Sequence, residues 1–477
     1  MRMNLVTGKM EEGEGDPALA SYHDMVKGKS IRDISHGFTP EDINLGLFDF
    51  QRDIVRWACQ KGRAAIFADT GLGKTAMQCV WADLVSRHTD RMVLILAPLC
   101  VAQQTVREAE KFGISVHYCR AQSEVRPGVN ITNYEMMDKF DLGTFGGVVL
   151  DESSILKSQD GKTRTALIEE AQMVPYRLSC TATPSPNDHM ELGNQAEFLG
   201  VMSTVEMLAM FFTHDGGETS KWRLKGHGKT KFWEWLSTWA IVIKRPSDLG
   251  YDDEGYDLPG LTMHEHIVDA EPTFGELFVT PAAGLLGRNQ ARRESVEDRV
   301  AACAELINES DEQWIVWCHL NDESDALEAA INGAKSVKGS DSTETKEARM
   351  LAFTDGSLRV LVTKPSIAGF GMNWQHCHQM AFVGLSDSWE QYYQAIRRCY
   401  RFGQTEVVNV HIVSSAAEGS VVENIRRKEA QSEELSQQMA AHMRDLMRSK
   451  IHATSNNKIA YLPKAKLTVP QWIRRHA

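Results

Sequence analysis

The residues best suited to chemistry are Lys74 and Thr75, which follow a turn that contains Gly71 and Gly73. An apolar run precedes this turn and a helix-prone segment follows it. The glycines let backbone N–H groups approach ligand oxygens closely, and the start of a helix points unpaired N–H groups at the same place. Lys74 would place an ammonium on the β- and γ-phosphates of ATP, and Thr75 a hydroxyl on Mg²⁺. The predicted ATP-binding loop comprises Ala68, Asp69, Thr70, Gly71, Leu72, Gly73, Lys74 and Thr75.

A small residue, Ala68, stands where the full phosphate-loop pattern begins with glycine. The alternative interpretation of the stretch is a glycine-rich turn with a surface lysine. An acidic partner further along the chain favours the phosphate loop.

That partner is the acidic pair Asp151 and Glu152, at the end of the apolar run Gly147–Asp151. Asp151 would hold Mg²⁺, usually through water, and Glu152 would orient or deprotonate the attacking water. An acidic cap at a strand end is the alternative. Together with the phosphate loop, the pair predicts a site that hydrolyses ATP.

A third group, Gln394, Arg398 and Arg401, lies in a segment, residues 388–404, that is predicted to be helical as far as Gly403. The spacing i, i+4, i+7 would place the three side chains on one helical face. Their planar donors suit phosphate oxygens, and the arginines could reach a γ-phosphate from a neighbouring domain as arginine fingers do. A solvated basic face or a nucleic-acid contact is the alternative.

Three more polar residues have possible roles. Gln51 begins a predicted amphipathic helix, residues 47–62, and its amide could read an adenine edge; a solvent-facing glutamine carries equal weight. Thr181 and Thr183 follow a short predicted strand, where their hydroxyls could relay between the nucleotide and a partner groove. A turn terminated by proline is the alternative for these threonines.

The elements that position these residues alternate between strands and helices in two separate regions. Such alternation predicts parallel sheets covered on both faces, with ligands at the carboxyl ends of the strands. In the first region we expect strands at 64–67, 92–98, 129–133 and 147–151 and helices at 76–85 and 100–112. In the second, which starts near residue 295, we expect strands at 314–318, 359–363 and 380–384 and a helix at 324–331.

The amino-acid composition indicates which class of protein this chain belongs to. The 477 residues are 42% hydrophobic and 24% charged, which is typical of a globular chain of two or three domains. No apolar run of about 18 residues occurs, so no membrane span is expected. The N-terminus lacks the apolar core of a secretion signal, and the nine cysteines form no C-x-x-C pair, so a reducing, cytoplasmic location is expected.

Net charge is −12, but the segment from Glu390 onward contains 14 Lys and Arg and only 8 Asp and Glu. A local basic cleft for nucleic acid is compatible with this distribution. Residues 200–260 hold four of the 11 tryptophans among cations. These rings could stack on bases, but tryptophans packed inside a small helical subdomain are the favoured interpretation. The cations beside these tryptophans are Lys221, Arg223, Lys225, Lys229 and Lys231.

In this order, the motifs resemble those of helicase superfamily two, and more closely its Swi/Snf-type DNA translocase branch, in the compact form of DEAD/DEAH-box-like proteins common in bacteriophages. The resemblance covers roughly residues 45–430. ADTGLGKT, VVLDESS and TATPSPN resemble the ATP-binding, hydrolysis and coupling motifs. LILAPLCVAQQTVREAEKFG resembles a motif that touches the DNA backbone, and GFGMN and QAIRRCYRFGQ resemble the fifth and sixth motifs.

The resemblance implies two tandem RecA-like domains that close on ATP and Mg²⁺ and translocate on duplex DNA without sequence specificity. It implies that Gln51, Gly369 and Gln394 bind ATP, and that Arg401 lies nearest the γ-phosphate. Ser153-Ser154 replaces the usual Ala-His or Ala-Asp of the hydrolysis motif, so the superfamily is better supported than the branch. A strand-separating DNA or RNA helicase, a non-catalytic binding module and an ATP switch acting on proteins are the alternatives.

The resulting expectation is an α/β fold with a small helical insertion and a C-terminal helix. A phage-encoded chain would act in the cytoplasm of its bacterial host. The expected segments are a lead-in (1–44), ATP-binding domain 1 (45–199), an insertion and connector (200–260), a linker (261–294), domain 2 (295–417) and a C-terminal helix with a basic tail (418–477).

Overall fold

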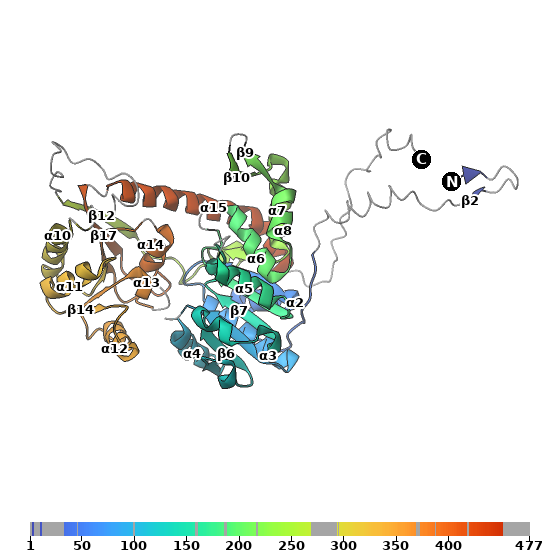
Figure 1. Ribbon diagram of the computed structural model, residues 1–477, viewed down its shortest axis with the longest axis horizontal. Helices are drawn as coiled ribbons and strands as arrows, with labels where there is room; N and C mark the ends of the chain where they lie inside the picture. The colour runs from blue at the N-terminus through green and yellow to red at the C-terminus, as the bar shows by residue number, and fades with distance from the viewer. Residues whose placement is uncertain are drawn as a thin grey trace.

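Two parallel sheets, each flanked by helices, form two α/β domains in the computed structural model (Figure 1). The fold class expected from the sequence is confirmed. The structure describes residues 2–3, 10–11, 33–44, 46–98, 101–157, 161–185, 188–215, 218–268, 293, 295–368, 373–386, 388–416 and 419–451.

The first domain is built on a seven-stranded sheet whose strands all run parallel. Its central strands are buried along their whole length, which is why they read as continuous apolar runs. In spatial order the strands are β11 (Ala240–Ile243), β3 (Arg63–Ala68), β8 (Tyr176–Thr181), β7 (Gly147–Asp151), β4 (Val93–Ala97), β6 (Val129–Asn133) and β5 (Val116–Tyr118).

Helices cover this sheet, and a short antiparallel hairpin projects beside α7 in Figure 1. The helices are α2 (Asp49–Lys61), α3 (Lys74–Thr89), α4 (Ala102–Glu110), α5 (Lys162–Ala171), α6 (Leu192–Leu199), α7 (Thr204–Phe211) and α8 (Lys229–Ser237). The antiparallel pairs are β9 (Phe212–Asp215) with β10 (Glu218–Leu224), and β1 (Arg2–Met3) with β2 (Met10–Glu11).

The region expected to be an insertion contributes to the first domain itself. No strand was predicted at β11, yet it pairs with β3 at the sheet edge. Trp233, Trp235 and Trp239 are buried in the same core, and Trp222 packs against it partly buried. The prediction that these tryptophans pack inside is confirmed.

The second domain is built on a six-stranded parallel sheet. Its strands in order are β12 (Leu261–Val268), β17 (Val408–Ser415), β16 (Gln379–Val383), β13 (Trp314–Trp317), β15 (Val360–Thr363) and β14 (Ala334–Val337). Its helices are α10 (Val296–Asn308), α11 (Asn321–Ala330), α12 (Thr343–Thr354), α13 (Pro365–Ala368) and α14 (Trp389–Ile396). The segment expected to begin a linker at residue 261 is instead the edge strand β12.

One long helix, α15 (Gly419–Ile451), confirms the predicted C-terminal helix. It leaves the second domain and runs across to α8 and β11 of the first (Figure 1). Met439, Met443 and Met447 of this helix are buried in the core of the first domain. The later part of α15 is therefore a structural part of the first domain, while Val421, Val422 and Ile425 at its start pack in the core of the second.

Some expectations concern residues outside those described. They include most of the lead-in, Gly369 and the basic tail beyond Ile451. Among the helices that are described, none is long and apolar enough to cross a membrane. The eight cysteines in the described part of the chain are free and buried.

Candidate active site

The predicted phosphate loop connects the end of β3 to the start of α3. Gly71 and Gly73 have φ angles of +92° and +78°, which favour glycine because a side chain in this conformation is strained. A Cβ at Gly73 would also lie 2.3 Å from Nε2 of Gln51. The sequence therefore needs glycine at both positions to form this loop.

Lys74 holds the loop together in this structure. Its ammonium donates hydrogen bonds to the carbonyl oxygens of Ala68, at 2.8 Å, and Asp69, at 3.3 Å. Burial lowers the pKa of Lys74, although the charges of Glu152, Asp69 and Asp151 act in the opposite direction. The ammonium thus lies among carboxylates at the start of α3, where a bound phosphate would also be held.

Asp151 and Glu152 follow directly at the end of β7. Burial, with the adjacent charge of Glu152, raises the pKa of Asp151 to about 7. Glu152 has a φ of +55°, which non-glycine residues rarely adopt and which is found at functional sites. The hydroxyl of Tyr134 donates a 2.8 Å hydrogen bond to the backbone oxygen of Asp151. Tyr134 fixes this strand end, and no local motif in the sequence pointed to it.

The two threonines at the end of β8 connect to this acidic pair. The hydroxyl of Thr181 donates to Oε2 of Glu152 at 3.3 Å and accepts from the backbone N–H of Thr183 at 3.1 Å. Both threonines are buried. The structure therefore joins the predicted coupling residues to the predicted general base.

The backbone around Gln394, Arg398 and Arg401 in the second domain differs from the predicted continuous helix. Helix α14 ends at Ile396, so Arg398 and Arg401 lie in turns and do not share a helical face with Gln394. The carbonyl of Arg398 accepts a hydrogen bond from the backbone N–H of Trp374, at 2.9 Å, in place of a helical partner. The predicted helix to Gly403 is therefore wrong by about two turns.

The turns nevertheless bring the arginines together. Arg398 donates to Oε1 of Gln394 at 3.4 Å, and Arg401 donates to Asn373. Burial and the positive charge of Arg401 lower the pKa of Arg398 to about 10. Arg398 is buried and Arg401 is half-buried. Two adjacent guanidinium groups disfavour each other's charge, and an anion bound beside them would relieve this cost.

A pocket of about 310 Å³ collects most of the predicted residues from both domains. Ala68 and Leu72 contribute only backbone carbonyls, to Lys74 and Gln51 respectively. Asp69 and Thr183 line a neighbouring pocket. The predicted residues that line the main pocket are Gln51, Thr70, Gly71, Gly73, Lys74, Thr75, Asp151, Glu152, Gln394, Arg398 and Arg401.

The donors in this pocket fit a magnesium ion bound together with a nucleotide. Thr75 supplies a hydroxyl, and the carboxyl of Asp151 is one that a cation would stabilise in its ionised form. Magnesium is typically bound by one or two carboxylates plus waters and phosphates. Within the described ranges no group of three or more His, Cys, Asp or Glu could hold a metal.

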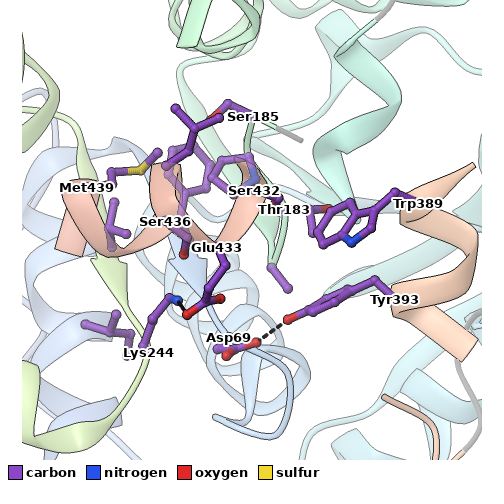
Figure 2. A pocket seen from close by; sticks show the side chains of 16 residues that line it. Asp69, Thr183, Ser185, Lys244, Trp389, Tyr393, Ser432, Glu433, Ser436 and Met439 are labelled. Atoms are coloured by element: carbon purple, nitrogen blue, oxygen red, sulfur yellow. Dashed lines mark hydrogen bonds and ion pairs between the residues drawn. The ribbon is translucent and has the colours of Figure 1, made fainter. Parts of the chain in front are cut away.

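Figure 2 shows the neighbouring pocket, of about 50 Å³, which residues of both domains line. The hydroxyl of Tyr393 donates to Asp69 at 2.7 Å, and Arg397 lies 3.5 Å from the other oxygen of this carboxylate. Burial alone would raise the pKa of Asp69, but Arg397 and the Tyr393 hydrogen bond bring it below its usual value. On α15, Glu433 pairs with Lys244 at 2.8 Å. Sequence reasoning missed Tyr393 and Arg397, and the available signal was their i, i+4 spacing across the end of α14.

Comparison with known proteins finds a family match within the second domain. Residues 298–403 match the family described as helicase conserved C-terminal domain, which is RecA-like and indicates the helicase superfamily. The chain is also similar to "Putative protein p41" of Acyrthosiphon pisum secondary endosymbiont phage 1. The two are 24% identical over 408 residues, which cover 73% of this chain and 87% of that protein. Neither match distinguishes the Swi/Snf-type branch.

Proposed function

We propose that this protein is an ATP-dependent, nucleic-acid-stimulated motor ATPase that translocates on duplex DNA. One observation carries the proposal: a single pocket receives Lys74, Asp151 and Glu152 from the first domain and Arg398 and Arg401 from the second. Hydrolysis at such a junction depends on how the domains are placed. Changes in their placement can therefore be linked to movement along a strand.

Each residue has a distinct role in this proposal. The loop amides and Lys74 bind the β- and γ-phosphates, and Glu152 orients the attacking water and accepts its proton. Arg398 and Arg401 stabilise charge on the transferred phosphoryl group. Thr75 and Asp151 would hold Mg²⁺, which neutralises phosphate charge when bound.

Coupling to DNA uses the contacts around this pocket. Thr181 bonds Glu152, so a shift at the end of β8 would reorient the general base. Asn373 of the second domain donates to Glu108 of the first at 3.1 Å, beside Arg401. Duplex binding through phosphate contacts, largely independent of sequence, would act on these junctions.

The test is steady-state ATP hydrolysis by the full chain alone, with single-stranded DNA, with duplex DNA and with RNA. We expect strong stimulation by duplex DNA, and a loss of about 10³-fold or more in kcat for Arg401→Ala, as for other arginine fingers. Arg427→Ala is the matched control, because Arg427 is exposed on α15 and bonds only neighbours on that helix.

Other outcomes would replace the proposal. Preferential stimulation by a single strand or RNA, together with duplex unwinding and no triplex displacement, would favour a strand-separating helicase. Hydrolysis that is indifferent to every nucleic acid would favour an ATP switch that acts on proteins. Unchanged biological activity in Lys74→Ala would favour a non-catalytic binding module.

A further inference from the structure

Three aromatic rings from distant parts of the chain meet in the pocket that holds the phosphate loop. Phe48 immediately precedes α2, Tyr256 lies between β11 and β12, and Phe402 follows α14. The ring centroids of Tyr256 and Phe402 are 4.8 Å apart, and Phe48 lies 6.0 Å from Tyr256 and 6.4 Å from Phe402. Each of the two domains supplies a phenylalanine, and the connector between them supplies the tyrosine.

These rings are not sealed into the core. Phe48 is 53% exposed and Phe402 is 38% exposed, although both are large and apolar. They line the same pocket as Lys74 and Thr75. Apolar surface that stays open inside a polar pocket favours a ligand with a flat apolar part.

The rings also lie directly beside the phosphate loop. A Cβ placed on Gly71 would lie 3.0 Å from the backbone nitrogen of Phe402 and 3.2 Å from its Cβ. The turn that carries Phe402 therefore touches the loop itself. A ligand with its phosphates on the loop amides would have its other end within reach of these rings.

The one polar side chain expected to read a base edge is already engaged. Oε1 of Gln51 accepts from the backbone N–H of Phe48 at 3.0 Å, and Nε2 donates to the carbonyl of Leu72 at 2.9 Å. Gln51 is buried, with its amide close against Gly73. These contacts make Gln51 a positioning residue that ties α2 to the phosphate loop.

We infer that Phe48, Tyr256 and Phe402 form the base-binding site, and that this site takes either purine by stacking without reading its edge. Stacking tolerates different bases because every base presents a π-face. The inference rests on the proposed function for the phosphates. It adds that ATP and GTP are comparable substrates, and that the base helps to hold the second domain, through Phe402, against the first.

Equilibrium competition against a fluorescent ATP analogue tests this inference on the full chain, with ATP, GTP and inorganic tripolyphosphate as Mg²⁺ complexes. We expect the affinities of ATP and GTP to agree within about threefold and both to exceed that of tripolyphosphate by about tenfold or more. Phe402→Leu should weaken ATP and GTP by about tenfold and leave tripolyphosphate unchanged. Phe402→Tyr keeps an aromatic face and should restore purine affinity.

Phe48→Leu provides a second variant, in the other domain. It should also weaken the binding of ATP and GTP and leave the binding of tripolyphosphate unchanged. Met173→Ala is the control, because Met173 is 77% exposed and does not line this pocket. Thermal unfolding of each variant shows whether it is folded.

Three results would overturn the inference. ATP binding more than about tenfold tighter than GTP would show that the edge is read. Equal affinity of wild type for ATP and tripolyphosphate would show that the base makes no contact with the protein. An equal loss of affinity for ATP, GTP and tripolyphosphate in Phe402→Leu would show that Phe402 supports the structure of the pocket and does not bind the base. If wild type bound neither ATP nor tripolyphosphate, the proposed ATPase function would itself fail, which is a different result.

Discussion

Opposite charges are concentrated around the candidate pocket. The carboxyls of Asp151 and Glu152 are adjacent at the end of β7, and Arg398 and Arg401 come from the second domain. Burial works against each charge, as the raised pKa of Asp151 and the lowered pKa of Arg398 indicate. A magnesium nucleotide would bring a cation to the carboxyls and anions to the arginines, so ligand binding should relieve both costs.

The pH dependence of stability tests this arrangement at Asp151. The folded pKa of about 7 exceeds the usual 3.8, so the folded protein retains a proton that the unfolded chain loses between these values. The stability from this group is therefore present below about pH 3.8 and lost as the pH rises through about 7. Without nucleotide or metal, wild type should lose more stability between pH 5 and 8 than Asp151→Asn, measured as the urea midpoint.

Glu135→Gln is the control for this experiment, since Glu135 is exposed. Its pH profile should follow that of wild type. Parallel profiles for wild type and Asp151→Asn would mean that the Asp151 carboxyl does not titrate in this range.

The residues of the candidate site that belong to short motifs could be predicted from the sequence. The residues that contact them only in the folded protein could not. Lys74, Asp151 and Glu152 were found because short motifs at strand ends carry them. Tyr134 and the aromatic ring of Tyr256 approach the site only through the tertiary fold, so no local spacing indicates them. Arg398 and Arg401 were found by type, while their predicted helical geometry was wrong.

At the scale of elements, buried strands were the most predictable part of the fold. The strands Val129–Asn133 and Gly147–Asp151 match the structure residue for residue. Gly147–Asp151 is a nearly continuous apolar run, as expected of a strand covered on both faces, whereas Val129–Asn133 alternates between apolar and polar residues. Strand β12 was missed, because an edge strand with exposed Met263 and Ile267 has polar neighbours and no such run. The predicted helix extended beyond the observed end of α14. The chain turns after Ile396, where the carbonyl of Arg398 accepts a hydrogen bond from the backbone N–H of Trp374, a residue distant in sequence.

Helix α15 allows a test of its attachment to the first domain. Met443 is fully buried in that domain's core, so Met443→Ala should lower the free energy of unfolding by about 2–5 kcal/mol. Urea unfolding of the full chain, followed by tryptophan fluorescence, measures this change. Gln438→Ala on the same helix should change it by less than about 0.5 kcal/mol, since Gln438 is exposed. Equal stability of the two variants would contradict the packing of α15 on the first domain.

At the scale of the whole molecule, polar contacts set how the two domains meet. Asp69 of the loop accepts a hydrogen bond from Tyr393 on α14 and pairs with Arg397, the residue that follows this helix. Lys157 of the first domain also pairs with Glu390 of the second. Because Asp69 belongs to the candidate phosphate loop, its contacts with the second domain connect that loop to the placement of the domains.

Arg397→Gln should shift the nucleotide-free protein towards more open arrangements. Loss of one partly buried ion pair costs about 1 kcal/mol, or about a fivefold change in the closed-to-open ratio. Small-angle X-ray scattering at low salt should show a larger radius of gyration than in wild type, and high salt should reduce the difference. Arg427→Gln should scatter like wild type. An unchanged radius in Arg397→Gln would mean that the Asp69 contact does not hold the domains.

The methionines of α15 also bear on the order in which the protein can mature. The first domain leaves the ribosome before the second, but Met439, Met443 and Met447, which complete its core, are translated only after the second domain. Until then, the surface of α8 and β11 that they cover is open to water or to chaperones. A nascent chain that stops before α15 would therefore carry an unfinished first domain, and premature termination should produce an aggregation-prone fragment instead of an independently folded domain.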